Sequence, residues 1–286
     1  LKMFICTIII ITATAADSRA DYKDGAETLH AKIPLLLSES HADHFNFLFE
    51  RCANMPATLL VLDAHADTVL NENYADIRRF AHNGEYEKAD LLLSNHNWIH
   101  PLYPRPVTNI TWVSKMHGAP NAEKLSGFYK STSLWGDAHL QTLSIEELHL
   151  FKVRGETLFV SIDLDFFYSE DHRTDQIPRV LDALFAISCE YQARGQAVLW
   201  AICISRPWLP SDKYAWTLLE TTLLWLAQKH PEYFTDAIVT IFNKPRFDQT
   251  QKAKGLRAEG KPVPDFWGKE EDAPKTVKEL LKLVGS

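Results

Sequence analysis

Residues 59–67 read Leu-Leu-Val-Leu-Asp-Ala-His-Ala-Asp, an apolar run that ends in three side chains able to bind a metal. A short apolar run bounded by polar residues is typical of a strand that is buried on both faces. Asp63, His65 and Asp67 follow at a spacing of two, which in an extended chain aims side chains in the same direction. Because α/β sheets bind ligands at the carboxyl ends of their strands, this stretch predicts both the fold and the site.

Two other stretches have the same form. Residues 157–167 read Thr-Leu-Phe-Val-Ser-Ile-Asp-Leu-Asp-Phe-Phe, so a second apolar run ends in Asp163 and Asp165. Residues 35–41 read Leu-Leu-Leu-Ser-Glu-Ser-His, and His41 is a possible sixth ligand, with His44 as the competing candidate. One carboxylate at a strand end is usually a helix cap or a turn former. Several crowded carboxylates repel one another unless a cation binds between them, so the stretches together predict a divalent-metal site.

Apolar runs alternate along the chain with longer stretches in which apolar residues return every three or four positions. This alternation is typical of βα units, and it predicts an α/β fold of three α/β/α layers around a mainly parallel sheet. The expected strands are residues 33–37, 58–62, 109–113, 157–162, 197–204 and 237–242. The expected helices are residues 44–52, 73–82, 145–151, 178–194 and 212–228.

The composition excludes several classes of protein. The chain has 286 residues, of which 46% are hydrophobic, and this content is too high for a disordered or collagen-like protein. Lys and Arg number 30 against 37 Asp and Glu, so the net charge is −7, and no basic stripe is present that would bind nucleic acid. The four cysteines are far apart and form no CxxC pair, which favours buried free thiols.

The ends of the chain differ from its centre. Residues 3–16 form an apolar run after Lys2 that closes in small residues, which predicts a signal peptide at 1–16; a buried β-strand is the alternative. Cleavage there implies a secreted or periplasmic protein, and otherwise the expected location is cytoplasmic. No run is long enough for a transmembrane segment. We expect a single domain over residues 17–286, with a core at 33–243, a polar loop at 244–274 and a closing helix at 275–283.

The two carboxylate motifs carry a family resemblance. Residues 63–67 resemble the DxHxD motif of arginase and the other ureohydrolases, and residues 161–165 resemble their SxDxD motif. With residues 39–41, 97–101 and 162–167, the chain resembles the arginase-like family of uncharacterised domains that includes the peptide arginases, over roughly residues 33–242. Those enzymes convert arginine side chains within peptides into ornithine. The resemblance implies an arginase-deacetylase-like fold.

The resemblance also implies a binuclear site with two Mn²⁺ per chain. Asp63 and Asp163 would bridge the metals, and the remaining ligands would be His41 and Asp67 on one ion and His65 and Asp165 on the other. Oxygen-rich spheres with one imidazole and no thiolate suit manganese. A hydroxide that bridges the metals would attack a guanidino carbon, and Asp67 would orient it.

A general acid and a substrate pocket complete the expected site. His96, His100 and His117 are the candidates for proton transfer to the leaving amine, and His117 lies in a stretch similar to the His-Gly-x-Pro segment of arginase. Asn97 and Trp98 are candidates for the substrate mouth, although Trp98 also fits a core position.

The pocket departs from the arginase pattern at one strand end. Arginases place a carboxylate after a late strand to pair with the guanidinium, whereas this chain has Arg206 there. Arg206 can bind a substrate carboxylate or a backbone carbonyl, or pair with a structural acid. The candidates for the guanidinium-pairing carboxylate are Glu39, Asp212 and Glu220.

The sequence therefore supports three hypotheses. The leading one is a manganese-dependent hydrolase of a carbon–nitrogen bond, whose substrate is a peptide or a small guanidino compound and whose products are ornithine and urea. The second is a deacetylase-type amidohydrolase with a single zinc ion, which would leave Asp67 and Asp165 without a role. The third is a non-catalytic module in which the metal braces a surface that binds a peptide or protein.

Overall fold

The computed structural model describes most of the chain between residues 32 and 241. The described residues are 32–52, 55–65, 67, 69–114, 139–152, 157–169, 174–229 and 233–241, with the single residues 276, 279 and 282. The expected signal peptide, the polar loop and His117 lie outside them. Glu279 and Lys282, from the expected closing helix, are helical. Among the described residues, no helix is both long and apolar enough to cross a bilayer.

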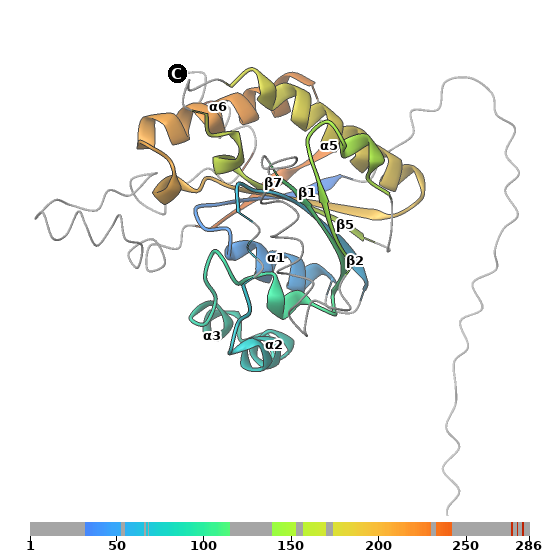
Figure 1. Ribbon diagram of the computed structural model, residues 1–286, viewed down its shortest axis with the longest axis vertical. Helices are drawn as coiled ribbons and strands as arrows, with labels where there is room; N and C mark the ends of the chain where they lie inside the picture. The colour runs from blue at the N-terminus through green and yellow to red at the C-terminus, as the bar shows by residue number, and fades with distance from the viewer. Residues whose placement is uncertain are drawn as a thin grey trace, which may run out of the picture.

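Strands and helices alternate along the described chain (Figure 1). The strands are β1 (Ile33–Ser38), β2 (Ala57–Leu62), β3 (Val107–Val113), β4 (His139–Leu143), β5 (Thr157–Asp163), β6 (Ala197–Cys203) and β7 (Phe234–Ile241). The α-helices are α1 (Asp43–Cys52), α2 (Tyr74–His82), α3 (Tyr86–Asp90), α5 (Gln176–Ala193) and α6 (Asp212–Lys229). Four 3₁₀ turns are η1 (His100–Leu102), η2 (Leu148–Leu150), η3 (Leu164–Phe167) and η4 (Arg206–Trp208).

The seven strands form one sheet in the order β4-β3-β2-β5-β6-β1-β7, and every neighbouring pair is parallel. Figure 1 shows α1, α2 and α3 on one side of this sheet and α5 and α6 on the other. The expected three-layer α/β fold is therefore confirmed. From β2 the chain continues to β3, whereas from β5 it continues to β6 on the opposite side, so the order reverses between β2 and β5. Such a reversal opens a crevice at the carboxyl ends of the two strands.

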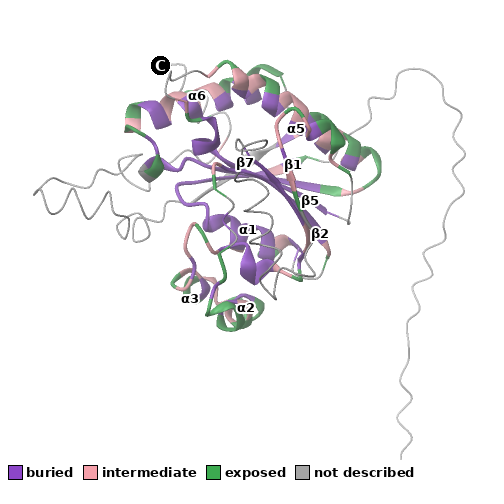
Figure 2. Ribbon diagram, viewed as in Figure 1, coloured by how far each residue is buried: buried purple, intermediate pink, exposed green. Residues whose placement is uncertain are grey.

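The core consists of two clusters, one on each face of the sheet. Leu60 and Leu62 of β2 pack in the cluster that α5 and α6 cover, and Leu59 and Val61 pack in the cluster that α1 covers. Successive residues of a strand point to opposite faces, so β2 is apolar throughout because helices cover both of its faces. Figure 2 shows the strands buried between the helical layers.

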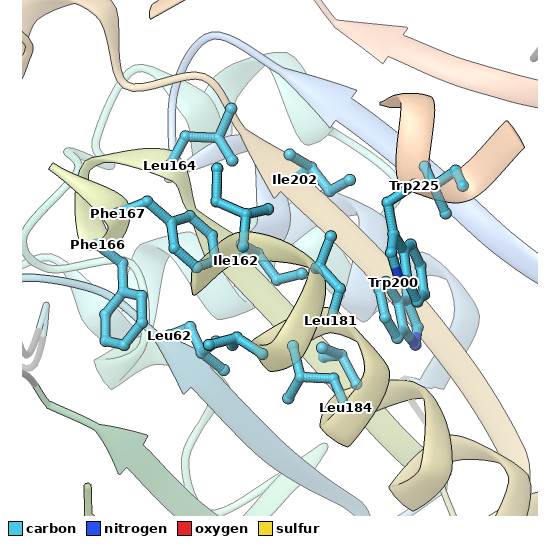
Figure 3. Close-up of a cluster of buried hydrophobic side chains, with 14 of the residues drawn as sticks. Leu62, Ile162, Leu164, Phe166, Phe167, Leu181, Leu184, Trp200, Ile202 and Trp225 are labelled. Carbon is cyan, nitrogen blue, oxygen red and sulfur yellow. The ribbon is translucent and has the colours of Figure 1, made fainter. Parts of the chain in front are cut away.

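The α5 and α6 side of the core is rich in aromatic residues. Figure 3 shows Leu181 and Leu184 of α5 among the side chains of β5 and β6. Trp200 of β6 lies parallel to Trp225 of α6, with ring centroids 6.2 Å apart, so the two tryptophans join this layer to the sheet.

The expected strands are all present, but the sequence analysis missed the edge strand β4. β4 pairs only with β3, and its sequence mixes His, Gln and Thr with two leucines. Continuous apolar runs, on which the expected strands rest, are typical of strands covered on both faces. A short edge strand does not need such a run, so the pattern of apolar runs does not predict β4.

The expected helix at residues 145–151 is wrong. Only the 3₁₀ turn Leu148–Leu150 forms there. Ser144 and Glu147 start a turn by exchanging side-chain and backbone hydrogen bonds. Ile145, Leu148 and Phe151 are three residues apart, which matches the three residues per turn of a 3₁₀ helix. The short α3 was not predicted either, because its five residues show no periodic apolar pattern.

Candidate metal centre

Side chains from three strand ends meet at the carboxyl ends of β2 and β5, where the strand order reverses. Asp63, His65 and Asp67 follow β2, Asp163 ends β5, Asp165 lies in η3, and His41 follows β1. Two groups of these residues present ligand atoms that lie within 4.8 Å of one another. The first group is His41, Asp63 and Asp67, and the second is Asp63, His65 and Asp165.

Asp63 belongs to both groups because its two oxygens face different histidines. The Asp63 Oδ2 atom lies 3.0 Å from Nδ1 of His41, and Oδ1 lies 3.7 Å from Nδ1 of His65. Its backbone carbonyl accepts a hydrogen bond from Nε1 of Trp112 at 3.0 Å. A carboxylate with one oxygen directed to each of two groups has the geometry of a bridging ligand.

The carboxylates of β5 and η3 complete the cluster. Asp163 Oδ2 lies 3.5 Å from Nδ1 of His41 and accepts a hydrogen bond from Ser205 Oγ at 2.8 Å. Asp165 Oδ2 lies 3.4 Å from Nδ1 of His65. The backbone N–H of Asp165 donates to Asp163 Oδ1 at 3.1 Å, which holds the two acids in a fixed relation. The structure thus places five of the six predicted ligands in the two groups, and the sixth, Asp163, lies beside them at 3.5 Å from His41 without belonging to either group.

Ser161 decides how His41 is oriented. Nδ1 of His41 faces the carboxylates, and Nε2 lies 2.7 Å from Ser161 Oγ. His44 contacts the same hydroxyl through Nδ1 at 2.8 Å, and its ring centroid lies 4.6 Å from that of His41. His41 therefore joins the acids, whereas the competing candidate His44 packs against the His41 ring and shares its contact with Ser161. Such outer contacts fix the ring orientation of a metal-binding histidine.

Asp67 is held from two sides. Its Oδ2 atom lies 2.8 Å from Nδ1 of His41 and accepts a hydrogen bond from Nε1 of Trp98 at 3.1 Å. The backbone of Asp67 has φ 48°, in the left-handed region that few residues other than glycine adopt. A non-glycine residue in this conformation persists where surrounding contacts enforce it, and such residues cluster at functional sites.

The cluster has a buried end and an open end. His41 is fully buried, whereas the side chain of His65 is 61% exposed. Among the other members, Asp63, Asp163 and Asp165 are buried. Solvent or a substrate therefore reaches the cluster from the His65 side.

Burial and crowding shift the pKa values of the acids and of His65 in the metal-free cluster. Burial and the charge of Asp63 raise the pKa of Asp67 to about 7. Burial is also the main cause that raises the pKa of Asp163 and Asp165, and neighbouring carboxylates add to it. Burial opposes ionisation of Asp63 as well, but the attraction of the two nearby histidines outweighs it and lowers its pKa to about 2. The neighbouring carboxylates of Asp165 and Asp63 raise the pKa of His65 to about 11.

The two imidazoles, even when protonated, can neutralise only two of the four carboxylates. Bound divalent cations would remove this conflict, because they favour the ionised acids that they contact. The donor set of acids and imidazoles without thiolate fits a hard or borderline divalent cation.

Of the expected proton-transfer histidines, the two that the structure describes, His96 and His100, lie outside the two groups. His96 is within 3.4 Å of Ser94 Oγ, two residues before it. His100 is buried, and its Nδ1 accepts a hydrogen bond from the backbone N–H of Asn71 at 2.8 Å. His100 therefore anchors the segment that follows Asp67. His117 is outside the described residues.

Asn97 and Trp98, expected at the substrate mouth, lie in a turn and in the core, respectively. Asn97 accepts a hydrogen bond from the backbone N–H of Ser94, so it stabilises a turn. Trp98 is fully buried, and its ring centroid lies 4.8 Å from that of His41. Trp98 thus packs beneath the cluster and contacts a candidate ligand from the core side.

Arg206 is buried in an ion-pair cluster with two acids. Its guanidinium donates to both carboxylate oxygens of Asp212, at 3.3 and 3.1 Å, and to Glu39 Oε1 at 3.0 Å. These are two of the acids named as candidates for the guanidinium-pairing carboxylate. The sequence left three kinds of partner open for Arg206: a substrate carboxylate, a backbone carbonyl or a structural acid. The structure shows pairing with structural acids.

Three supporting residues were missed by the sequence analysis. Ser161 and Ser205 bond to candidate ligands, and Trp208 lies beside His65 with ring centroids 5.8 Å apart. The position of Ser161, two residues before Asp163, was a usable signal, because it places both side chains on the same face of β5. Ser205 and Trp208 left no such signal, since their contacts depend on how β6 lies beside β5.

No protein-family model matches the chain, and no curated protein sequence matches it.

Proposed function

We propose that this protein is a binuclear metal-dependent hydrolase that cleaves a carbon–nitrogen bond of a guanidino group. The proposed substrate is an arginine side chain in a peptide, and the products are ornithine and urea. The observation that carries the proposal is the shared position of Asp63 in two groups of ligand atoms. One metal would need only one of these groups, so the second group favours a pair of ions over a single zinc.

The donor set favours manganese. Each group contains one imidazole and two carboxylates, and described residues near the cluster supply no thiolate to either group. Oxygen-rich donors suit Mn²⁺, whereas structural zinc prefers thiolates and imidazoles. Two such cations a few ångströms apart activate water near neutral pH and stabilise charge that develops on the substrate.

The residues of the chain would hold and orient the reacting groups. Asp67 lies at the edge of the first group, where its position is fixed by His41 and Trp98. From there its carboxylate would accept a hydrogen bond from the attacking water. His65, the exposed member of the cluster, would face the substrate.

The test measures metal content and urea release in the same preparations. The purified protein, loaded with Mn²⁺ and freed of excess metal, should hold close to two ions per chain and release urea from arginine-containing peptides. Asp63→Asn combined with Asp163→Asn should abolish both properties, because it removes two of the four carboxylate charges of the cluster, including the one that both groups share. Asp76→Asn, at an exposed acid paired with Arg79, is the control and should change neither. Thermal melting checks that each variant is folded.

The outcomes separate the proposal from its alternatives. Mass spectrometry of the peptides detects the conversion of arginine into ornithine. One tightly bound zinc ion with release of acetate from acetylated amines would support the deacetylase-type reading. Two bound metals with no turnover of any arginine peptide would support a metal-braced binding module. Retention of two metal ions in the double variant would contradict the assignment of these residues as the metal site.

A further inference from the structure

Trp208 is an exposed aromatic side chain beside the open end of the candidate metal centre. It is 58% exposed, and its ring centroid lies 5.8 Å from that of His65 at an interplanar angle of 51°. A tryptophan is large and apolar, so leaving more than half of it in water forgoes a substantial part of its burial energy. An exposed tryptophan next to a candidate ligand is therefore well placed to contact a substrate.

The turn that carries Trp208 is held in place by the cluster itself. Ser205, just before η4, has φ 56° and donates its hydroxyl to Asp163. The backbone N–H of Trp208 donates to the Ser205 carbonyl at 3.0 Å. Arg206 is 1% exposed and bonded to two acids. These contacts fix the backbone at Trp208, so its ring is presented without a large ordering cost on binding.

The charges around this turn allow a cation to approach. Arg206 carries one positive charge against the two negative charges of Glu39 and Asp212, so the ion-pair cluster is net negative and does not repel a guanidinium. Two divalent cations would balance the four aspartates of the centre. Within the described residues, Arg206 pairs with Glu39 and Asp212, two of the three acids named as candidates for pairing with a guanidinium, so these two are engaged with a cation of the protein itself.

We propose that the indole face of Trp208 binds the planar cationic group of the substrate by cation–π stacking. This inference rests on the proposed function for the identity of the cation. A guanidinium is planar and weakly hydrated, so it stacks well on an aromatic face. Stacking at Trp208 leaves the reactive carbon close to His65 and hence to the centre.

The test compares a cationic probe with a neutral one of the same shape. N-acetyl-arginine amide and N-acetyl-citrulline amide differ in the charge of the side-chain head group. Their dissociation constants are measured at low temperature on the full-length, Mn²⁺-loaded protein, with urea assayed in the same samples. The variants are Trp208→Phe, which keeps an aromatic face, and Trp208→Leu, which keeps apolar volume without a π system. Tyr74→Leu is the control, because Tyr74 is also an exposed ring against a histidine, His100, away from the centre.

We expect Trp208→Leu to weaken binding of the arginine probe by about tenfold and to leave the citrulline probe nearly unchanged. Trp208→Phe should lose less, and Tyr74→Leu should lose nothing. Equal losses for both probes, or no loss in Trp208→Leu, would overturn the stacking site. Metal content is measured on every variant, since loss of metal would explain weak binding by damage to the centre and would also overturn the assignment.

The same data keep this inference apart from the proposed function. Probe binding that depends on Trp208, without any urea release, would reject the hydrolase and retain the stacking site. Urea release with a KM for arginine peptides that is the same in Trp208→Leu and the unmodified protein would retain the hydrolase and reject the stacking site.

Discussion

The hydroxyl of Ser161 connects two histidines that play different parts. Oγ lies 2.7 Å from Nε2 of His41 and 2.8 Å from Nδ1 of His44. One hydroxyl can donate a single hydrogen bond and accept others. Ser161 therefore couples the orientation of a candidate ligand to that of a fully buried histidine behind it.

Ser161→Ala should weaken Mn²⁺ binding by about tenfold, because His41 loses the contact that orients its ring. Metal affinity can be measured by calorimetry or by competition with a chelator. Ser188→Ala is the matched control: Ser188 is also a buried serine, and it bonds to Leu184 and Trp200 away from the centre. It should lower stability and leave the affinity unchanged. Equal affinities for Ser161→Ala and the unmodified protein would contradict an orienting role.

Arg206 is a second residue whose environment decides its role. It is almost completely buried, and so is Glu39, whereas Asp212 is half-exposed. Removing one partner of a buried ion pair leaves an uncompensated charge in the interior.

Arg206→Met should therefore destabilise the protein by about 3–5 kcal/mol. Adding Glu39→Gln should recover part of this loss, because the stranded acid disappears and the two substitutions act on one contact. Urea denaturation of the two variants measures the difference. If the double variant were less stable than Arg206→Met alone, Glu39 would have a stabilising partner other than Arg206.

At the scale of elements, β2 supports both the core and the centre. All six of its residues are buried, and it pairs with β3 on one side and β5 on the other. Its even-numbered leucines face α5 and α6, its odd-numbered residues face α1, and the strand ends directly at Asp63. Any shift of β2 would displace the shared carboxylate.

Leu60→Ala should destabilise the protein by about 2–5 kcal/mol, because it leaves a cavity at a fully buried position in the middle of the sheet. Leu224→Ala, the same change at a partly exposed position of α6, should cost about 0.5 kcal/mol or less. Chemical denaturation gives both values. Similar losses of unfolding free energy at the two positions would show that Leu60 is not tightly packed in the core.

At the scale of the whole molecule, sheet order assembles the centre. β1 lies two strands away from β5, beyond β6, yet the segment after β1 brings His41 to the acids that follow β2 and β5. Because the ligands come from three distant segments, a metal that binds all of them links parts of the chain that the unfolded protein keeps apart.

Metal removal should therefore lower the thermal stability of the whole domain. A ligand present at about 100 times its Kd adds about 2.7 kcal/mol to the free energy of unfolding, so treatment with a chelator should lower Tm by about 5 °C or more, and Mn²⁺ should restore it. The double variant Asp63→Asn and Asp163→Asn should show no such shift. A shift of equal size in that variant would place the stabilising metal elsewhere.

The sequence by itself determined the three-layer α/β class and the identity of the four clustered aspartates and of His65. Burial on both faces requires continuous apolar runs, and the spacing of two after a strand is a local property of an extended chain. Both requirements are visible without knowledge of distant contacts.

Only the tertiary structure decided which histidine joins the acids, where Arg206 and Trp98 lie, and that β4 completes the edge of the sheet. His41 and Ser161 are 120 positions apart, and Arg206 and Glu39 are 167 apart. Contacts at such separations depend on the order of the strands, and a periodic pattern reports burial but carries no record of which distant partner supplies it.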